Sequence, residues 1–190
     1  MRKFLVSVLM ITLLLLPGCG EREKRLESGF ETFRESLTAA ESVTARVELT
    51  VSSGATAAEY TMDVAYDGRK TDMTLLAPEI LAGITASAEK GETAIEWGSV
   101  RLGAGPLDED GLTPVSAVPA MLDAMESGYV ELLWWEEDYI AARLHIGETS
   151  VLTLWLEEDT LTPVSAEISS GGLAALCCEI GEWTLLKPSP

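Results

Sequence analysis

Apolar residues occupy every second position over much of this chain, and this alternation limits the folds that it can adopt. Ala45, Val47, Leu49 and Val51 alternate with polar residues, and the same pattern runs from Ala58 to Tyr66. Successive side chains of a strand point to opposite faces of its sheet. A period of two is therefore typical of a sheet that is buried on one face only. The sequence predicts an antiparallel sheet of this kind.

Two segments break the alternation and have the spacing of helices instead. From Glu21 to Ser42, apolar residues recur at intervals of three and four, which places them on one stripe. From Leu112 to Gly128, a second helix is predicted to begin near Pro114 or Pro119 and to end at Gly128. The stripe of the first helix consists of Leu26, Phe30, Phe33, Leu37 and Ala40.

Further strands are predicted on both sides of the second helix. They span Thr71–Leu76, Gly83–Glu89, Thr93–Gly98, Tyr129–Glu136, Tyr139–Ile146, Ser150–Glu157, Thr162–Ser169 and Leu173–Trp183. Asp67-Gly68 and Lys90-Gly91 are hairpin signals, and Gly103-Ala104-Gly105 is interpreted as a turn that lacks a dinucleotide-binding fingerprint. The strands that begin at Ser150 and Leu173 are apolar at both sets of alternating positions, so burial on both faces is expected for them.

The order of these elements predicts an α+β fold in which a curved antiparallel sheet carries an N-terminal helix and an inserted helix. No linker rich in Pro, Gly or Ser and no internal repeat divides the chain after residue 18. Residues 19–190 are therefore predicted to form a single domain, which is long enough to bury a substantial core.

The N-terminus has the composition of an export signal. Two basic residues precede an apolar run, Phe4 to Leu16, that is shorter than the roughly 20 residues of a transmembrane helix. Leu16, Gly18 and Cys19 resemble the lipobox of bacterial lipoproteins, in which the cysteine receives a diacylglyceryl group and the preceding bond is cut. Residues 1–18 are then a signal peptide. The alternatives are an ordinary signal peptide with a chance cysteine, or an uncleaved anchor.

The lipobox resemblance implies attachment to the cell membrane, on its extracytoplasmic face, through a covalent diacylglycerol on Cys19. Two acyl chains hold a protein stably at a bilayer, because each buried methylene contributes about 0.8 kcal/mol. No second long apolar segment follows, so the rest of the chain is expected to be a tethered globular domain.

The chain is strongly acidic, with 13 Lys and Arg against 31 Asp and Glu and a net charge of −18. Removal of Arg2 and Lys3 with the signal peptide leaves 11 against 31, or −20. Nucleic acids and anionic headgroups repel such a domain, so nucleic acid is not expected as a partner. A basic partner remains open, beside an acidic surface that serves solubility alone.

No constellation of catalytic residues is evident. His145 is the one histidine and falls on the polar side of its strand. Cys177 and Cys178 are neighbours, so in a regular strand they point to opposite faces and make a poor disulfide or zinc site. Asp108 to Gly111 resembles part of a calcium loop but lacks the later glutamate. We expect no enzyme activity, no metal and no cofactor apart from the lipid on Cys19.

Tryptophan is the most suggestive residue type in the chain. All five tryptophans fall in predicted strands, and Trp134 and Trp135 must point to opposite faces. Core packing explains such residues, but an apolar groove or a protein interface would use them as well. The candidate residues for ligand or partner binding are Trp134, Trp135, Leu154 and Trp155.

Three stretches resemble the LolA-like fold, which the N-terminal part of RseB shares. The leading helix runs into Val43-Thr44-Ala45-Arg46-Val47, the central stretch spans Leu75 to Ile84, and Leu154 to Val164 forms a strand, an acidic turn and a proline-led strand. The resemblance implies an incomplete antiparallel barrel around helices. It is strongest to the lipid-anchored, Gram-positive branch that includes the germination lipoprotein GerS.

This resemblance implies a non-catalytic, membrane-anchored lipoprotein whose half-barrel binds an apolar ligand, either an acyl chain or a lipoprotein. The alternative is a GerS-like interaction protein that supports a cell-wall hydrolase in sporulation or germination. A tether argues against a shuttling carrier. A dry pocket between sheet and helices would favour the ligand, and a filled core with an exposed apolar strip would favour the protein partner.

Overall fold

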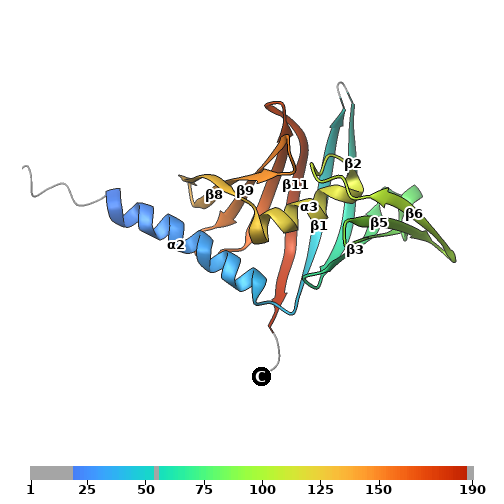
Figure 1. Ribbon diagram of the computed structural model, residues 1–190, viewed down its shortest axis with the longest axis horizontal. Coiled ribbons are helices and arrows are strands. Elements are labelled where there is room, and N and C mark those ends of the chain that lie inside the picture. Colours follow the sequence, from blue (N-terminus) through green and yellow to red (C-terminus); the bar gives the residue numbers. More distant parts are fainter. Residues whose placement is uncertain (1–18, 54–55, 188–190) are drawn as a thin grey trace, which may run out of the picture.

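The computed structural model describes residues 19–53 and 56–187, in which two α-helices lie against one antiparallel sheet (Figure 1). The helices are α2 (Cys19–Thr38) and α3 (Pro114–Ser127), and a short 3-10 helix, η1, spans Glu79–Leu81. The strands are β1 (Ser42–Ser53), β2 (Thr56–Tyr66), β3 (Lys70–Ala77), β4 (Thr85–Glu89), β5 (Glu92–Trp97), β6 (Val100–Pro106), β7 (Val130–Glu136), β8 (Tyr139–Ile146), β9 (Ser150–Glu157), β10 (Pro163–Ser170) and β11 (Leu173–Leu186).

The strands form a curved sheet of 11 strands that does not close into a barrel, in the order β6-β5-β4-β3-β2-β1-β11-β10-β9-β8-β7. The first and last strands therefore pair at its centre, where Val47 lies opposite Ile180. Helix α3 connects the two edge strands, β6 and β7, and packs on β8 and β4. The predicted α+β fold with a curved antiparallel sheet and two packed helices is confirmed.

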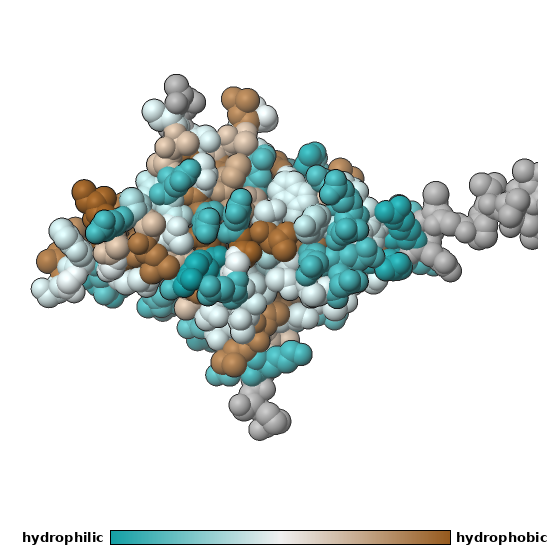
Figure 2. Space-filling model, turned by 180° about the vertical axis from the view of Figure 1, so that it is seen from behind, coloured by the Kyte–Doolittle hydropathy of each residue, from teal (hydrophilic) through white to brown (hydrophobic). Residues whose placement is uncertain are grey.

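The two faces of the sheet differ in burial. The helix face, on which α2 and α3 lie, carries the core, and Val47, Leu49, Leu152 and Leu156 are buried there. The outer face carries polar residues between them, such as Glu48. Figure 2 shows the side away from the helices, where hydrophilic (teal), intermediate (white) and hydrophobic (brown) residues are interspersed over the surface.

The predicted stripe holds α2 on the sheet, because Leu26, Phe30, Phe33 and Leu37 are all buried. The helix ends at Thr38, four residues before the predicted Ser42, which belongs to β1. No helix within residues 19–53 and 56–187 has the length and apolar composition that are needed to cross a bilayer.

Local chemistry explains why α3 begins at Pro114, the first of the two predicted starts. The hydroxyl of Thr113 accepts a hydrogen bond from the Ser116 backbone N–H at 3.2 Å, and the Ser116 hydroxyl accepts one from the Thr113 N–H at 3.2 Å. This reciprocal pair is a capping box, and a proline at the first position needs no N–H partner. Pro119 lies inside the helix.

Two expectations about strands are wrong. Gly103-Ala104-Gly105 is not a turn but part of the edge strand β6, because Gly103 and Gly105 pair with Ala94 and Thr93 of β5 around a bulge, which glycines in strands often mark. Burial on both faces fails for β11, where Leu173 is 76% exposed and Cys177 is exposed. Its inner set, which includes Leu176 and Ile180, is buried as expected for a sheet that helices cover on one face.

Candidate functional site

The structure places Trp134 and Trp135 on opposite faces of β7, as predicted. Trp135 lies on the helix face, where its indole N–H donates to the Arg22 carbonyl oxygen at 3.3 Å. The Arg22 guanidinium lies 5.6 Å from the centre of the same ring. This cation–π contact and hydrogen bond join the first turns of α2 to the edge strand, so Trp135 is a packing residue in this structure.

Trp134 and Trp155 lie on the outer face and share one carboxylate. The strand register places Ala141 of β8 between them. Glu136 Oε2 accepts hydrogen bonds from the Trp134 indole at 3.1 Å and from the Trp155 indole at 3.0 Å. Ala141 is 0% exposed although it faces outward, because the rings cover it. Arg143 lies over the Trp134 ring at 5.7 Å. We call these five residues the tryptophan pair site.

Leu154 points in the opposite direction and lies in a filled core. It is 0% exposed and belongs to the same buried cluster as Leu144 and Ile168. None of the cavities described below has Leu154 in its lining. This candidate binding residue therefore lies in packed core.

The largest described cavity, of about 590 Å³, lies between α3 and the ends of strands β2 to β4. Tyr66, Thr71 and Ala88 line one wall, and Arg69 and Lys90 lie at the cavity as well. The Tyr66 phenol donates to Glu126 of α3 at 2.7 Å. Burial first, and then this hydrogen bond, raise the pKa of Tyr66 above its ordinary value. The lining is mixed in character, unlike that of a dry apolar pocket.

An open apolar surface lies instead on the helix face of the β5–β6 hairpin. Trp97 is paired with Val100, and Ile95 with Leu102, so these four side chains point to one face. Trp97 is 71%, Val100 55% and Leu102 63% exposed, and Ile95 is half-buried against the core. We call these four residues the apolar strip. Ile80 in η1 is exposed at the same end of the sheet.

Sequence reasoning missed the apolar strip because it interpreted the glycines after Leu102 as a turn. The alternation Ile95, Trp97, Val100, Leu102 around the two-residue loop Gly98-Ser99 is a hairpin signal that could have revealed β6. That no helix would cover this hairpin depends on the position of α3, which no local pattern encodes.

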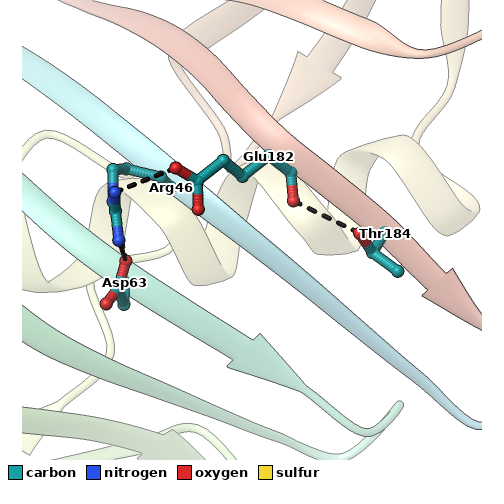
Figure 3. A network of polar contacts seen from close by, with 4 residues as sticks. All are labelled: Arg46, Asp63, Glu182 and Thr184. Atoms are coloured by element: carbon teal, nitrogen blue, oxygen red, sulfur yellow. Dashed lines mark hydrogen bonds and ion pairs between the residues drawn. The ribbon is translucent and has the colours of Figure 1, made fainter.

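The outer face also carries a polar network at its centre (Figure 3). Arg46 of β1 forms ion pairs of 2.9 Å with Asp63 of β2 and with Glu182 of β11. The hydrogen bond to Asp63, followed by the charges of both carboxylates, raises the pKa of Arg46. Thr184 donates to the Glu182 carbonyl oxygen at 3.5 Å. The network joins the three central strands on their exposed side.

The cysteines and the calcium-like loop take structural positions. Burial, with a smaller effect of Cys177, raises the pKa of Cys178 to about 12. Asp110 accepts backbone hydrogen bonds from Thr149 at 2.8 Å and from Glu148 at 3.1 Å, and it thereby holds the β8–β9 turn. Residues 19–53 and 56–187 contain no cluster of three or more His, Cys, Asp or Glu that could hold a metal. The side chain of Cys19 lies outside the described residues.

Comparison with known proteins identifies the fold. No family model and no curated protein matches the sequence. A LolA superfamily protein from Nitrosomonas europaea aligns over 86% of this chain and 94% of its own, with 12% identity and a TM-score of 0.52. An uncharacterized conserved protein from Thermus thermophilus aligns over 86% of this chain and 89% of its own, with 11% identity and a TM-score of 0.50.

A structure of the CwlD amidase in complex with the GerS lipoprotein, from Clostridioides difficile, also aligns, over 86% of this chain and 94% of that chain, with 10% identity and a TM-score of 0.44. The unclosed sheet and its two helices agree with the first of these alignments. This chain has the LolA-like fold, an incomplete antiparallel barrel around helices.

Proposed function

We propose that this chain is a non-catalytic lipoprotein that binds an apolar ligand, an acyl chain or a lipidated protein, on the apolar strip. A diacylglyceryl group on Cys19 would hold it at the extracytoplasmic face of the cell membrane. The observation that carries the proposal is the exposure of Trp97, Val100 and Leu102 together on the helix face. Apolar side chains that gather on one exposed surface are typical of binding sites.

The strip continues the core toward solvent. Met73 and Ala86 are buried on the helix face, and Ile95 and Leu102 extend the same row across the sheet. Full burial of a large apolar side chain contributes about 1.5–3 kcal/mol. A flexible acyl chain could follow such a row and cover several of these side chains at once, which supports an acyl chain as the guest.

The core is filled and the apolar strip is exposed, which is the arrangement expected for a protein partner rather than for a buried acyl chain, so the proposed ligand has to bind on the surface. Leu154 is completely buried, so a charge there would disrupt folding before it affected a ligand. Leu102 is 63% exposed and tolerates a charge, so it is the informative position. Leu173 is 76% exposed at the β10–β11 hairpin, far along the sheet from β6, and provides a matched control.

Native mass spectrometry of residues 20–190, purified from a bacterial host, tests the proposal. We expect a bound mass of fatty-acid or phospholipid size on the parent chain, loss of that mass in Leu102→Glu, and its retention in Leu173→Glu. Circular dichroism would show that both variants fold. A bare parent chain, or equal ligand occupancy in both variants, would contradict the proposal.

The alternative function, support of an envelope protein such as a cell-wall hydrolase, would use a different surface. Trp155 lies on the outer face, away from the strip and from Leu154. The chemistry of that face restricts the kind of partner that it could bind, because its two halves differ in charge and in aromatic content.

A further inference from the structure

We propose that the outer face binds a basic segment of another polypeptide, in a band that runs across the sheet from Trp134 to Glu48. The band follows one row of the strand register, which we call the docking row. Its members, from β7 to β1, are Trp134, Ala141, Trp155, Ser165, Glu179 and Glu48. This surface is separate from the apolar strip, so the proposal does not depend on the proposed ligand.

One half of the docking row is aromatic and held in place. Because Glu136 accepts a hydrogen bond from each indole, the edges of Trp134 and Trp155 are fixed and their N–H groups are satisfied. Both side chains remain half-buried, so part of each ring stays accessible. An indole face attracts Lys and Arg side chains through its quadrupole, as the contact of Arg143 with Trp134 illustrates.

The other half of the docking row is acidic and unpaired. Glu48 of β1 lies directly opposite Glu179 of β11. No hydrogen bond or ion pair joins either carboxylate to another residue among those that the structure describes. Like charges directly opposite on neighbouring strands destabilise a sheet. A cation from a partner would relieve this repulsion.

The surface is hollowed on either side of this carboxylate pair. Two shallow grooves, of about 430 Å³ and 420 Å³, both have Glu48, Ser165 and Glu179 in their linings. Glu182 lines the first and Glu59 the second. Adjacent strands lie about 4.8 Å apart, so Trp155 and Glu179, two strands apart, are separated by about 10 Å. An extended peptide that crosses the strands can reach the indoles and the grooves together.

Charge complementarity identifies the partner as basic. Strands β1, β2 and β7–β11 contain two arginines and no lysine. Arg46 is engaged by Asp63 and Glu182, and Arg143 lies over Trp134. The face therefore offers carboxylates and indoles to a ligand but few free cations. A second copy of this chain, with its net charge of −18, would be repelled.

Binding of a labelled peptide in which lysine and serine alternate tests this proposal. The full chain would be held in nanodiscs of neutral phosphatidylcholine, and the peptide in which glutamate and serine alternate serves as the negative probe. We expect the double variant Glu48→Gln, Glu179→Gln to bind the lysine peptide roughly tenfold more weakly, since each of the two exposed carboxylates contributes a modest charge attraction to the lysine side chains. The same variant should unfold at an equal or higher denaturant concentration, because it loses a repulsion.

A charge-matched control separates this site from general attraction. The double variant Glu79→Gln, Glu92→Gln removes the same charge from exposed positions in η1 and β5. It should leave the affinity for the lysine peptide within about twofold of the parent. Trp155→Leu should weaken binding, whereas Trp97→Leu should not. Equal weakening in both double variants, or no effect of either, would overturn the proposal. Capture of vesicles that contain a cationic lipid, without binding of the peptide, would overturn it in favour of a lipid surface.

Discussion

The guanidinium of Arg34 in α2 donates a hydrogen bond from Nε to the backbone carbonyl oxygen of Met125 in α3, at 3.0 Å. The same group also donates to the carbonyl oxygens of Ala124 and Gly128. The last carbonyl groups of a helix have no partner within it, so Arg34 caps α3 from a neighbouring helix. Burial lowers the pKa of Arg34 from its ordinary value.

Replacement of Arg34 by methionine should destabilise the fold, because it keeps much of the apolar stem but removes the donor to the Met125 and Gly128 carbonyl groups, whereas the Ala124 carbonyl also accepts the Gly128 N–H. Hydrogen bonds that involve a charged group contribute about 1.5–3 kcal/mol, so we expect a loss of about 2 kcal/mol in the free energy of unfolding. Urea denaturation would measure it. Arg101→Met removes an exposed ion pair with Glu96 and should change stability by less than about 0.5 kcal/mol. Equal losses in the two variants would contradict the capping role.

Asp110 should make stability depend on pH on the acidic side. Hydrogen bonds from the Thr149 backbone and hydroxyl and from the Glu148 backbone lower the pKa of Asp110. The unfolded chain, in which the pKa is about 3.9, then binds this proton more readily than the folded chain. The contribution is present above that pH and is lost as the pH falls through the lower native pKa. Thermal melts from neutral to acidic pH should show a steeper loss for the parent than for Asp110→Asn. Parallel curves would refute the assignment.

The two neighbouring thiols should differ sharply in reactivity. Cys177 is exposed, whereas Cys178 is buried with its pKa raised to about 12. The thiolate is the reactive form, so a maleimide should modify Cys177 in the folded protein and Cys178 only after denaturation. Peptide mass spectrometry would locate the label. Rapid native labelling at Cys178 would show that β11 opens far more readily than its buried inner face indicates.

The proposed lipidation of Cys19 can be tested directly in cells. A bacterial host that is fed labelled palmitate should incorporate label into the parent chain but not into Cys19→Ser, and the variant should leave the membrane fraction. Cys177→Ser is the matched control and should retain both the label and the membrane association. Membrane association of Cys19→Ser would favour an uncleaved anchor over the lipobox interpretation.

The sequence predicted those features of the fold that depend on local physics. The period of two from Ala45 onward and the stripe from Leu26 to Leu37 reflect burial of one face, and Thr113 and Pro114 mark a helix start. Edge strand β6 escaped prediction, because its glycines have a local preference for turns that pairing with β5 overrides. Local propensity can identify many helices and strands, but pairing with a neighbouring strand decides whether a segment of ambiguous propensity becomes a strand.

The candidate residues show the same limit more clearly. Alternation correctly placed Trp134 and Trp135 on opposite faces, but it did not show which of the two faces the helices. It could not show that Glu136 joins two indoles, because that contact depends on β7 and β9 lying on either side of β8. Nor could it show which apolar residues remain uncovered, since the exposure of Trp97 and Leu102 depends on which strands α3 covers.

The central position of β11 has a consequence for the order in which the sheet can be assembled. A ribosome makes β1 to β10 first, and at that stage β1 has no neighbour on one side and β10 has none on the other. The sheet then consists of two halves, each with an unpaired edge strand. The final strand, β11, closes the gap when it pairs with β1 at Val47 and with β10 at Ala166. Loss of the last fourteen-residue strand, Leu173–Leu186, would therefore divide the molecule at its middle. A growing chain therefore cannot complete this sheet before residues Leu173–Leu186 have been made.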